Sequence, residues 1–423
     1  MSTDRKELGV ALVGAGFINS VHANAWLSVR DSEIVAICSP TAENANKLAG
    51  ACRDLGVGRP KIYSDIRETV NDPRVDAVWV SSPNYARLAT ISAITEEVRE
   101  DRSNVRGIAC EKPLAASVRD AKEMLRLVES AGILHGYLEN QVFAPSLTRG
   151  KEIVWRFATD SGRPYLARAA EEHGGPHSAW FWVPQMSGGG VVLDMMCHSL
   201  EASRFMLTSP DETREQLKVQ TVSGEIASLK WTQPQYVEEL KKSTGGRANY
   251  SDSPAEDFGR ATVTFESAGG NTVMAETSVL WCYTGPGVRI ILDLLGPEYY
   301  MSVNSLQTDL HVFSSRNVKP KSGVYFVEKQ AAEQGLMPTV ADESFTYGFQ
   351  AEDRHMVQSF LQNKMPMENW HDGLAILEII MACYMSAERG KRLKFQTGSF
   401  DNYIPQPARG KWNPAQNFID TVN

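Results

Sequence analysis

Lys112, Asp194 and His198 are the residues of this sequence best suited to move protons. Lys112 stands in Glu111-Lys112-Pro113, at the end of an apolar segment, and a lysine there can exchange a proton with a substrate hydroxyl. Asp194 and His198 lie four residues apart in GGGVVLDMMCH, so a helix projects both from one face. Each feature also has a structural interpretation: a surface lysine at a turn, and an Asp–His hydrogen bond within a helix. The three glycines before the helix favour a catalytic role, because they let another group approach the backbone.

A glycine-rich turn near the start of the chain predicts a dinucleotide site. In VALVGAGFINSVHA, Gly14 and Gly16 follow an apolar strand and precede a helix. Such a turn lets the backbone approach a pyrophosphate, whose charge then lies at the N-terminus of the helix. A tight turn without a ligand is the alternative. The position of the motif in the first unit of an alternating strand–helix pattern favours the dinucleotide.

The second predicted strand lacks the acid that usually binds the ribose hydroxyls of NAD. It ends in Cys38-Ser39-Pro40-Thr41, and no arginine or lysine follows at once to bind a 2′-phosphate. We therefore expect NAD as the cofactor, with NADP left open.

Short apolar runs alternate with helical stretches from residue 8 to about 140, which predicts an α/β domain with a doubly wound parallel sheet. The expected strands are LGVALVGAG, SEIVAICSP, VDAVWVSSP, VRGIACEKP and ILHGYLEN. Between the last two strands, SVRDAKEMLRLVESAG has helical periodicity, with Ser117 placed to cap its start and Gly132 its end. We expect residues 1–141 to form the dinucleotide-binding domain.

Residues 142–423 have the pattern of a second α/β domain, for substrate binding and oligomerisation. GRATVTFESAGGNTVMAETSVLW and VRIILDLLGPEYYMSVN alternate at period two, which predicts a large, mainly antiparallel open sheet. Residues 232–258 and 314–345 look like insertions at the surface or at the mouth of the site. Strong helices between about 350 and 390 are expected to pack back toward the first domain.

Taken together, VGAGFINSVHA, VDAVWVSSPN, ACEKPLA, GGGVVLDMMCHSLE and SAERGKRLKF resemble the Gfo/Idh/MocA family, named after glucose-fructose oxidoreductase and inositol 2-dehydrogenase. These segments cover most of residues 8–396. The resemblance implies an N-terminal Rossmann domain, a C-terminal domain with an open sheet, a bound nicotinamide cofactor, and a catalytic group of Lys112, Asp194 and His198. We expect cofactor contacts from Gly14, Gly16, Phe17, Ile18, Ser39, Ser82, Pro83, Asn84, Glu111, Lys112 and Asn140.

Several positions depart from the usual pattern of that family. Asn19 stands where Gly or Ala is common, and Ser39 replaces the ribose acid. Arg87 takes a place where His is frequent, and Val142 one that is often Arg. The departures bear on the cofactor's identity and on substrate orientation, and they leave the catalytic group intact.

The segment HGGPHSAWFWVPQMSGGG gathers imidazole and indole side chains just before the predicted catalytic helix. A sugar offers an apolar C–H face and a rim of hydroxyls, which aromatic faces and imidazole donors suit. We predict substrate contacts for His173, His177 and Trp180, with core packing as the alternative. Phe181 is expected to lie in the core.

The resemblance and these residues predict an oxidoreductase that acts on a CH–OH group of a sugar, cyclitol or glycoside by hydride transfer to nicotinamide. Lys112 would be the principal acid/base, helped by His198, with Asp194 orienting it. One alternative is a redox-neutral, NAD-dependent glycosidase that oxidises C3 transiently, eliminates the aglycone and adds water, for example on an anionic glycoside such as a sulfoquinovoside. Another is a non-catalytic cofactor-binding regulator, against which the retained catalytic group argues.

The composition excludes several classes of protein. With 43 Lys and Arg against 51 Asp and Glu, the formal net charge is −8, and no block of five basic residues occurs, so no nucleic-acid partner is expected. Lys151, Arg163 and Arg168 could bind an anionic substituent, although roles on a solvated face are expected. No window of about 18 residues is free of charges and turn residues, so we expect no signal peptide, no membrane span and a cytoplasmic protein.

The six cysteines form no CxxC pair and no Cys/His cluster at zinc spacing, so we expect free, mostly buried thiols and no metal. The open sheet predicted for the second domain leaves one face without helices from its own chain. Such a face needs a partner, and a homodimer or homotetramer is expected.

Overall fold

The computed structural model describes residues 7–315 and 335–414, and the chain divides into two compact units. The first unit comprises Met1–Ala144 together with Tyr347–Ala375. The second comprises Pro145–Thr346 together with Ile376–Asn423. The sequence pattern placed the boundary at residue 141 and expected helices of about 350–390 to pack back toward the first domain; of these, the part up to Ala375 belongs to the first unit.

A six-stranded sheet with the order β3-β2-β1-β4-β5-β6 forms the centre of the first unit, and every neighbouring pair is parallel. The strands are β1 (Leu8–Val13), β2 (Ser32–Cys38), β3 (Lys61–Tyr63), β4 (Ala77–Val80), β5 (Gly107–Glu111) and β6 (Leu134–Leu138). All five predicted strands are present. The sequence missed β3, because three residues are too few to show a period. The strand order reverses between β1 and β4, and in such sheets ligands bind at this switch point.

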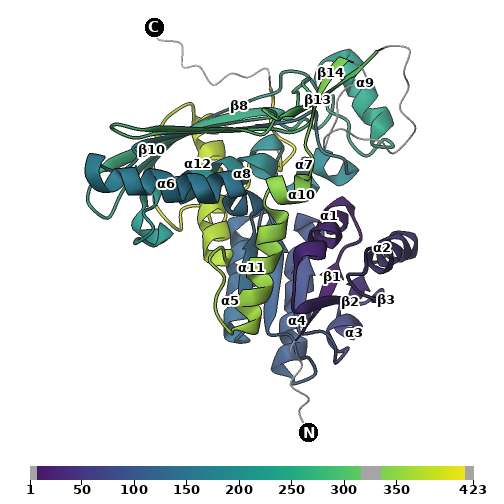
Figure 1. Cartoon of the computed structure of the whole chain (residues 1–423). Helices are drawn as coiled ribbons and strands as arrows, with labels where there is room; N and C mark the ends of the chain where they lie inside the picture. Colours follow the sequence, from purple (N-terminus) through teal and green to yellow (C-terminus); the bar gives the residue numbers. More distant parts are fainter. Residues whose placement is uncertain (1–6, 316–334, 415–423) are drawn as a thin grey trace. The chain divides into compact units, whose positions relative to one another are not determined.

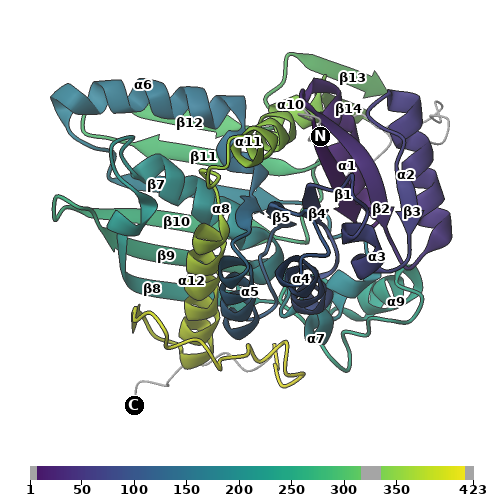
Figure 2. The same ribbon diagram turned by 90° about the horizontal axis from the view of Figure 1, so that it is seen from below.

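The helices of the first unit fall into two groups. Helix α1 contacts both α2 and α11, while α4 contacts both α3 and α5 (Figure 2). The predicted caps of α5 are present: Ser117 Oγ accepts the backbone N–H of Asp120 at 3.1 Å, and Gly132 has a φ of +67°. The helical segments are α1 (Phe17–Ala25), α2 (Ala42–Leu55), α3 (Ile66–Val70), α4 (Asn84–Arg99), α5 (Val118–Ser130) and α11 (Phe349–Leu361), with 3₁₀ turns η1 (Trp26–Ser28) and η2 (Asn140–Phe143).

Helix α11 comes from the late segment and completes the core of the first unit. The ring of Phe360 lies 5.8 Å from that of Trp79, edge to face, and both side chains are fully buried. Gly107, at the start of β5, lies directly against the Phe360 ring. This close approach needs a residue without a Cβ.

A seven-stranded sheet with the order β12-β11-β7-β10-β9-β8-β15 forms the second unit. It is mainly antiparallel, as predicted, but β7 and β10 pair in parallel. Buried residues alternate along β9 and β10, as the period-two pattern indicates. The strands are β7 (Leu166–Glu172), β8 (Lys218–Ala227), β9 (Phe258–Glu266), β10 (Thr272–Leu280), β11 (Arg289–Leu295), β12 (Tyr300–Asn304) and β15 (Leu393–Lys394), with a separate pair β13 (Leu310–Ser314) and β14 (Gly335–Thr339).

Helix α8 packs along one face of this sheet and contacts β7, β9, β10 and β11, with α6 on the same side (Figure 1). Helix α12 begins in the first unit and passes into the second after Ala375. The helical segments are α6 (Pro145–Ser161), η3 (Ala179–Trp182), α7 (Pro184–Ser187), α8 (Val191–Leu207), η4 (Arg214–Gln216), α9 (Pro234–Ser243), α10 (Glu343–Thr346) and α12 (Trp370–Arg389).

Residues 232–258, predicted to lie at the surface or at the mouth of the site, are mostly exposed or partly exposed, but several of them pack inside the second unit. Its Val237, Leu240 and Tyr250 are buried, and so are the charged Glu256 and Asp257. Asp257 accepts backbone N–H groups from the turn before α9, including that of Leu229 at 2.7 Å. Scattered apolar residues among polar ones hid this packing from the sequence pattern. Of the second predicted insertion, residues 316–334 lie outside the described part of the chain.

All six cysteines are free, and five of them are buried, as expected: Cys38, Cys52, Cys110, Cys197 and Cys383, with Cys282 partly exposed. Within residues 7–315 and 335–414, no helix is both long and apolar enough to cross a membrane.

Gly107→Ala should destabilise the first unit by about 1–3 kcal/mol, the usual cost of overpacking a core. A Cβ at this position would lie 2.5 Å from Cγ of Phe360, so the ring must move. Urea unfolding of the variant and of the wild type measures the effect.

Gly50→Ala is the matched control. Gly50 lies within α2, and an added Cβ would meet only Arg53 Nη2, at 3.8 Å. This change should stabilise the helix by about 0.5–1 kcal/mol, because alanine loses less backbone entropy. Equal unfolding midpoints for the two variants would contradict the packing described for Phe360.

Candidate functional site

All of the predicted cofactor residues lie at or just past the carboxyl ends of strands in the first unit. Because these strands are parallel, their carboxyl ends share one edge of the sheet. The residues follow β1 (Gly14, Gly16, Phe17, Ile18), β2 (Ser39), β4 (Ser82, Pro83, Asn84), β5 (Glu111, its last residue, and Lys112) and β6 (Asn140).

The glycine turn after β1 has the geometry that a pyrophosphate site needs. Gly14 has a φ of +95°, and an added Cβ would lie only 3.0 Å from the carbonyl oxygen of Ser81. Gly16 is the N-cap of α1, and no atom of the described residues comes within 4 Å of a Cβ built on it. The first turn of α1 has neither an acidic residue nor a side-chain cap. Its N–H groups therefore suit an anion in the open space beside Gly16.

Asn19, one of the unusual residues of the motif, holds this turn in place. It is fully buried, and its Nδ2 donates to the carbonyl oxygen of Gly14 at 2.5 Å. Its Oδ1 accepts the hydroxyl hydrogen of Ser81 at 2.9 Å. The amide therefore fastens the glycine turn to the chain just past β4, which a glycine or alanine at position 19 could not do.

Two serines complete the polar lining of this edge. The buried Oγ of Ser82 has no hydrogen-bond partner within residues 7–315 and 335–414, which leaves a donor for a ligand. Ser39 is buried too, and its Oγ accepts the backbone N–H of Thr41 at 3.2 Å. These groups fit a neutral ribose hydroxyl, and the edge as a whole fits a dinucleotide.

Arg87, the second unusual residue, braces the segment that carries Lys112. Its guanidinium is 3% exposed and donates to the carbonyl oxygens of Glu111, Lys112 and Pro113. Its Nε also donates to the carbonyl oxygen of Ser82 at 2.9 Å. One fixed side chain therefore ties the end of β4 to the end of β5.

Glu111 is bound on both of its carboxylate oxygens within the first unit. Oε2 accepts the backbone N–H of Lys112 at 3.0 Å, and Oε1 lies 3.1 Å from Nε2 of His22. Although burial opposes it, the hydrogen bond and charge of His22 lower the pKa of Glu111. Asn140 has a structural bond as well, because its Nδ2 donates to the carbonyl oxygen of Tyr347 at 2.7 Å.

Asp194 and His198 lie in the first two turns of α8, on one face, and both are buried. Trp281, just past β10, donates from Nε1 to Oδ2 of Asp194 at 3.2 Å. This bond fixes the carboxylate in one orientation within the second unit.

Two of the three glycines before α8, Gly189 and Gly190, allow close contacts with other parts of the second unit. An added Cβ on Gly189 would lie 2.2 Å from the hydroxyl oxygen of Tyr384, and one on Gly190 would lie 2.3 Å from the carbonyl oxygen of Glu256. Glu256 Oε1 accepts N–H groups from Gly190 at 2.8 Å and Val192 at 3.1 Å, and the Tyr384 hydroxyl at 2.5 Å. The glycines thus let a buried carboxylate cap the helix that carries Asp194 and His198.

Burial raises the pKa of Glu256 to about 7, against the lowering effect of these hydrogen bonds. A carboxyl group with a raised pKa in the folded protein prefers to be protonated there. Its contribution to folding is therefore present at low pH and is lost as the pH rises through the folded pKa.

The aromatic segment before α8 separates into an exposed and a buried part. Trp180 and Phe181 stack at 3.7 Å and are both partly exposed, and His177 is exposed. The prediction that Phe181 is a core residue is therefore wrong. The core residue is Trp182, whose ring packs between the tryptophans of neighbouring segments, 5.0 Å from Trp281. The 3₁₀ turn η3 rotates Phe181 outward, which residue types alone do not reveal.

His173 follows β7 and is buried, and its Nδ1 accepts the backbone N–H of Gly175 at 2.9 Å. This bond leaves the hydrogen of the neutral ring on Nε2.

The three basic residues considered for an anionic substituent all have partners within the second unit. Lys151 donates to the carbonyl oxygen of Phe205 at 2.6 Å, and burial lowers its pKa to about 7, so it is not a solvated-face residue. Arg163 pairs with Glu212 at 3.2 Å. Arg168 is exposed and pairs with Glu276 at 2.7 Å on the sheet.

Sequence reasoning missed His22, Asp353 and Glu256, whose hydrogen bonds fix the segments that carry the candidate residues. A signal existed for His22, since it falls on the buried face of the helix that follows the glycine turn. A signal also existed for Asp353, an acid among the apolar positions of a strong helix. Nothing in the polar segment around Glu256 marks it as a helix cap.

Two family models match most of this architecture. A model of an oxidoreductase family with an NAD-binding Rossmann fold, Gfo/Idh/MocA, matches residues 8–137. A model of the Gfo/Idh/MocA C-terminal domain matches residues 158–293. Together the two matches span more than half of the chain.

Several curated proteins are similar in sequence. A 1,5-anhydro-D-fructose reductase from Ensifer adhaerens is 29% identical, over 50% of this chain and 60% of the relative. A D-glucoside 3-dehydrogenase from Escherichia coli is 27% identical, over 48% and 55%. The chain thus spans little more than half the length of these two relatives. A D-apiose dehydrogenase from Paraburkholderia graminis is 23% identical over 94% of this chain and 92% of the relative.

Solved structures share the fold at lower identity. GenD2 from gentamicin A biosynthesis, in complex with NAD, has a TM-score of 0.73 at 21% identity, covering 93% of this chain and 97% of that one. Levoglucosan dehydrogenase in complex with NADH has a TM-score of 0.68 at 19% identity, covering 92% and 99%.

Glu256→Gln should remove a pH dependence of stability. An ordinary glutamate titrates near 4.5, so the raised pKa of about 7 makes the free energy of unfolding of the wild type fall, relative to the variant, by about 3 kcal/mol between pH 4.5 and pH 7. Glutamine keeps the oxygen that caps α8 but does not titrate. Urea unfolding of both proteins at several pH values measures the difference, and a difference that stays constant from pH 4.5 to pH 8 would contradict the assignment.

Proposed function

Because this chain belongs to the Gfo/Idh/MocA family and carries its NAD-binding Rossmann fold, we propose that it is an NAD-dependent oxidoreductase of a sugar, cyclitol or glycoside. The observation that carries the proposal is the glycine turn at the open N-terminus of α1, on the same sheet edge as Lys112. The carbohydrate class is supported by relatives named as a D-glucoside 3-dehydrogenase and a D-apiose dehydrogenase. In domain terms, residues 1–141 would bind the dinucleotide and residues 142–423 the substrate.

Lys112 is the acid/base of the proposed reaction. Its Nζ accepts the proton of the substrate hydroxyl as the carbinol carbon is oxidised. NAD, when bound, supplies the acceptor for the hydride. Arg87 and Glu111 hold the Lys112 backbone in one position, so little reorganisation is needed during the proton transfer.

The roles of Asp194 and His198 follow the family resemblance, and those of His173, His177 and Trp180 follow their residue types. Asp194 and His198 assist proton transfer from α8, with Asp194 fixed by Trp281. His173, His177 and Trp180 contact the substrate. The exposed imidazole of His177 and the stacked Trp180–Phe181 pair suit the hydroxyl rim and the C–H face of a sugar ring.

A redox-neutral glycosidase is the second candidate. One of the relatives is named as a D-glucoside 3-dehydrogenase, and oxidation of a glycoside at C3 is the first step of this reaction. In this reaction C3 is oxidised, the aglycone is eliminated, water adds, and the hydride returns to C3.

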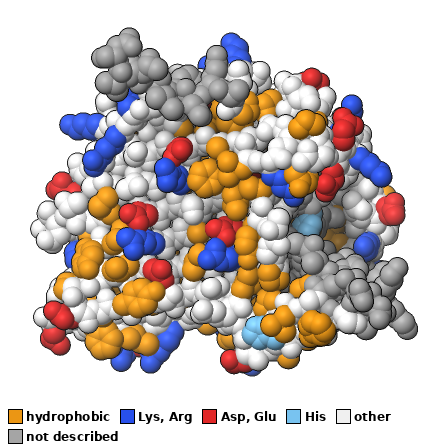
Figure 3. All heavy atoms as spheres, turned by 90° about the horizontal axis from the view of Figure 1, so that it is seen from above, with side chains coloured by type: hydrophobic (Ala, Val, Ile, Leu, Met, Phe, Trp, Pro, Cys, Tyr) orange, Lys and Arg blue, Asp and Glu red, His pale blue; other side chains and the backbone are white. Residues whose placement is uncertain are grey.

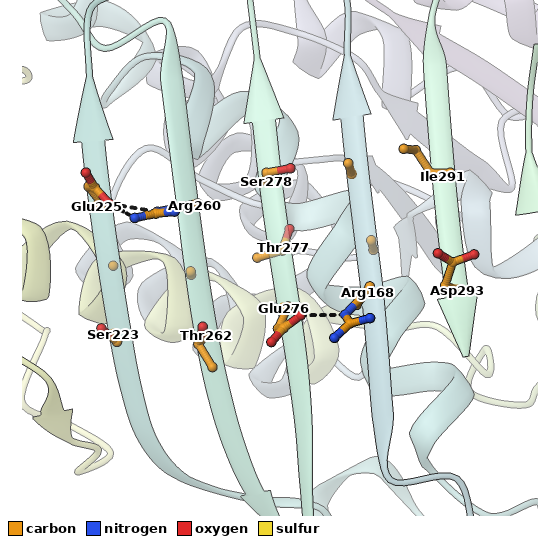
Figure 4. A pocket seen from close by; sticks show the side chains of 14 residues that line it. Arg168, Ser223, Glu225, Arg260, Thr262, Glu276, Thr277, Ser278, Ile291 and Asp293 are labelled. Atoms are coloured by element: carbon orange, nitrogen blue, oxygen red, sulfur yellow. Dashed lines mark hydrogen bonds and ion pairs between the residues drawn. The ribbon is translucent and has the colours of Figure 1, made fainter. Parts of the chain in front are cut away.

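We also propose that a second copy covers the open face of the large sheet. Thr277 of β10 hydrogen-bonds Ser199 of α8, so its neighbours Glu276 and Ser278 point to the opposite face. That face has a shallow hollow, in which Arg168 pairs with Glu276 and Arg260 with Glu225 (Figure 4).

Acidic and basic side chains also lie in adjacent pairs among hydrophobic ones in the space-filling view from above (Figure 3). A surface on which opposite charges alternate can pair with itself about a twofold axis. A homodimer, or a homotetramer built from it, is the expected assembly.

Lys112→Ala should lower turnover by about 10² or more, the usual effect of losing an acid/base, while NAD binding and folding change little. The assay follows nicotinamide absorbance with a panel of sugars and glycosides, and fluorescence titration gives the NAD affinity. Reduced cofactor should rise in proportion to the substrate consumed. Turnover near the wild-type rate would remove Lys112 from the mechanism.

The same assay distinguishes the second candidate. A redox-neutral glycosidase releases aglycone at flat nicotinamide absorbance, and its product formed in deuterated water carries deuterium at C2, because the neighbouring C3 ketone makes that C–H acidic. This result would overturn net oxidation as the function.

Thr262→Arg should shift the protein from dimer or tetramer to monomer. Thr262 lines the hollow on the open face, and an arginine there adds bulk and unpaired charge. Thr159→Arg, at an exposed position of α6 on the other side of the sheet, is the control and should keep the wild-type mass. Sedimentation velocity gives the masses, and a monomeric wild type at micromolar concentration would refute the proposal.

A further inference from the structure

His22 lies fully buried between two carboxylates in the first unit. Its Nδ1 is 3.0 Å from both carboxylate oxygens of Asp353 in α11, and its Nε2 is 3.1 Å from Oε1 of Glu111 at the end of β5. These carboxylates are charged acceptors, so each ring nitrogen must donate a hydrogen. An imidazole that donates from both nitrogens is an imidazolium cation.

The surroundings support this charge state. Burial alone would lower the pKa of His22, but the charges and hydrogen bonds of Asp353 and Glu111 raise it well above the ordinary value. Trp79 also donates from Nε1 to Asp353 Oδ1 at 2.9 Å. The cation is therefore held in a fixed frame of acceptors.

Glu352, the neighbour of Asp353, adds no negative charge beside His22. It is fully buried, and neither of its carboxylate oxygens has a hydrogen-bond partner within the described part of the chain. Burial, together with the charge of Asp353, raises its pKa well above the ordinary value, so it remains protonated. Glu352 therefore does not compete for His22, which serves Asp353 and Glu111.

The bridge joins the two features on which the proposed function rests. His22 lies on α1, the helix that begins at Gly16 of the glycine turn. Glu111 accepts the backbone N–H of Lys112 with its other oxygen, at 3.0 Å. A displacement of the Glu111 carboxylate would therefore be transmitted directly to Lys112.

We propose that His22 is a positioning residue that, as a buried cation bridging Glu111 and Asp353, fixes the backbone of Lys112 relative to the helix of the glycine turn. The inference rests on the proposed role of Lys112. Removing the imidazolium leaves two buried carboxylates facing an empty space, and the Lys112 segment keeps only the anchor that Arg87 provides. The glycine turn keeps its own anchor through Asn19 and Ser81.

His22→Gly with added imidazole tests the bridge. The variant should lose protection of the Lys112 amide in hydrogen–deuterium exchange, and turnover should fall by about ten- to a hundredfold, while NAD affinity changes by less than about threefold. Imidazolium entering the cavity presents two opposed N–H groups and should restore both protection and turnover. Pyrazole is an isomer of the same size with adjacent nitrogens, so it cannot bridge the two carboxylates and should restore neither.

Equal rescue by imidazole and pyrazole would show that His22 only fills space and would overturn the proposal, as would wild-type protection and turnover in His22→Gly without any additive. Met124→Ala, at a fully buried position of α5, controls for general loss of stability and should leave the Lys112 amide protected.

If His22→Gly does not fold, His22→Gln provides the same readouts. Its amide fills most of the space but turns an oxygen toward one carboxylate, so loss of Lys112 protection at retained NAD affinity supports the bridge, and wild-type behaviour overturns it. A wild type without turnover on any substrate would refute the proposed function alone, because the exchange measurement needs no substrate.

Discussion

A charge that leaves water must find partners inside the protein, and this requirement organises both units. In the first unit, Arg87 is satisfied by backbone carbonyl oxygens and His22 by two carboxylates. In the second, Oε1 of the buried Glu256 accepts N–H groups at the start of α8 and the hydroxyl of Tyr384. Breaking a buried charged contact of this kind costs about 3–5 kcal/mol, more than most single packing contacts. Each of these groups therefore fixes the backbone near a candidate catalytic residue more firmly than loop packing could.

The features that the sequence predicts well are those that depend on neighbouring residues. The strand–helix alternation, the turn at Gly14 and the caps at Ser117 and Gly132 each depend on a few consecutive positions. The Asp194–His198 spacing is likewise read from one helix turn. These local patterns sufficed for the parallel sheet, for the mainly antiparallel sheet and for the residues at the sheet edge.

The features that the sequence could not predict depend on partners far apart in the chain. His22 and Asp353 are separated by 331 positions, and Glu256 and Gly190 by 66. Before the fold is known, a lone histidine in a helix and a glutamate in a polar segment have many equally good partners. The predictions for Phe181 and Lys151 failed for the same reason, because packing across the unit decides how exposed each side chain is.

The departures from the family pattern have a physical meaning that the motif alone obscures. Asn19 and Arg87 depart from the family pattern, yet each supplies several hydrogen bonds that join β4 to its neighbours in the sheet. In this chain the amide of Asn19 and the guanidinium of Arg87 brace this edge of the sheet. The space beside Gly16 stays open, since no atom of the described residues comes within 4 Å of a Cβ built there.

The late return of Tyr347–Ala375 to the first unit constrains the order of events during synthesis. When the ribosome has completed residue 144, the sheet has all six strands, but Phe360 and Asp353, one of the two carboxylates that bind His22, have not yet been made. The nascent unit must wait for about 200 further residues, at roughly 5–20 residues per second, with a hydrophobic face exposed and a histidine short of one partner. The order of the segments makes this folding intermediate unavoidable. A chaperone would act on it by shielding the hydrophobic face during the delay. A protease would act on it by removing chains that stall before Asp353.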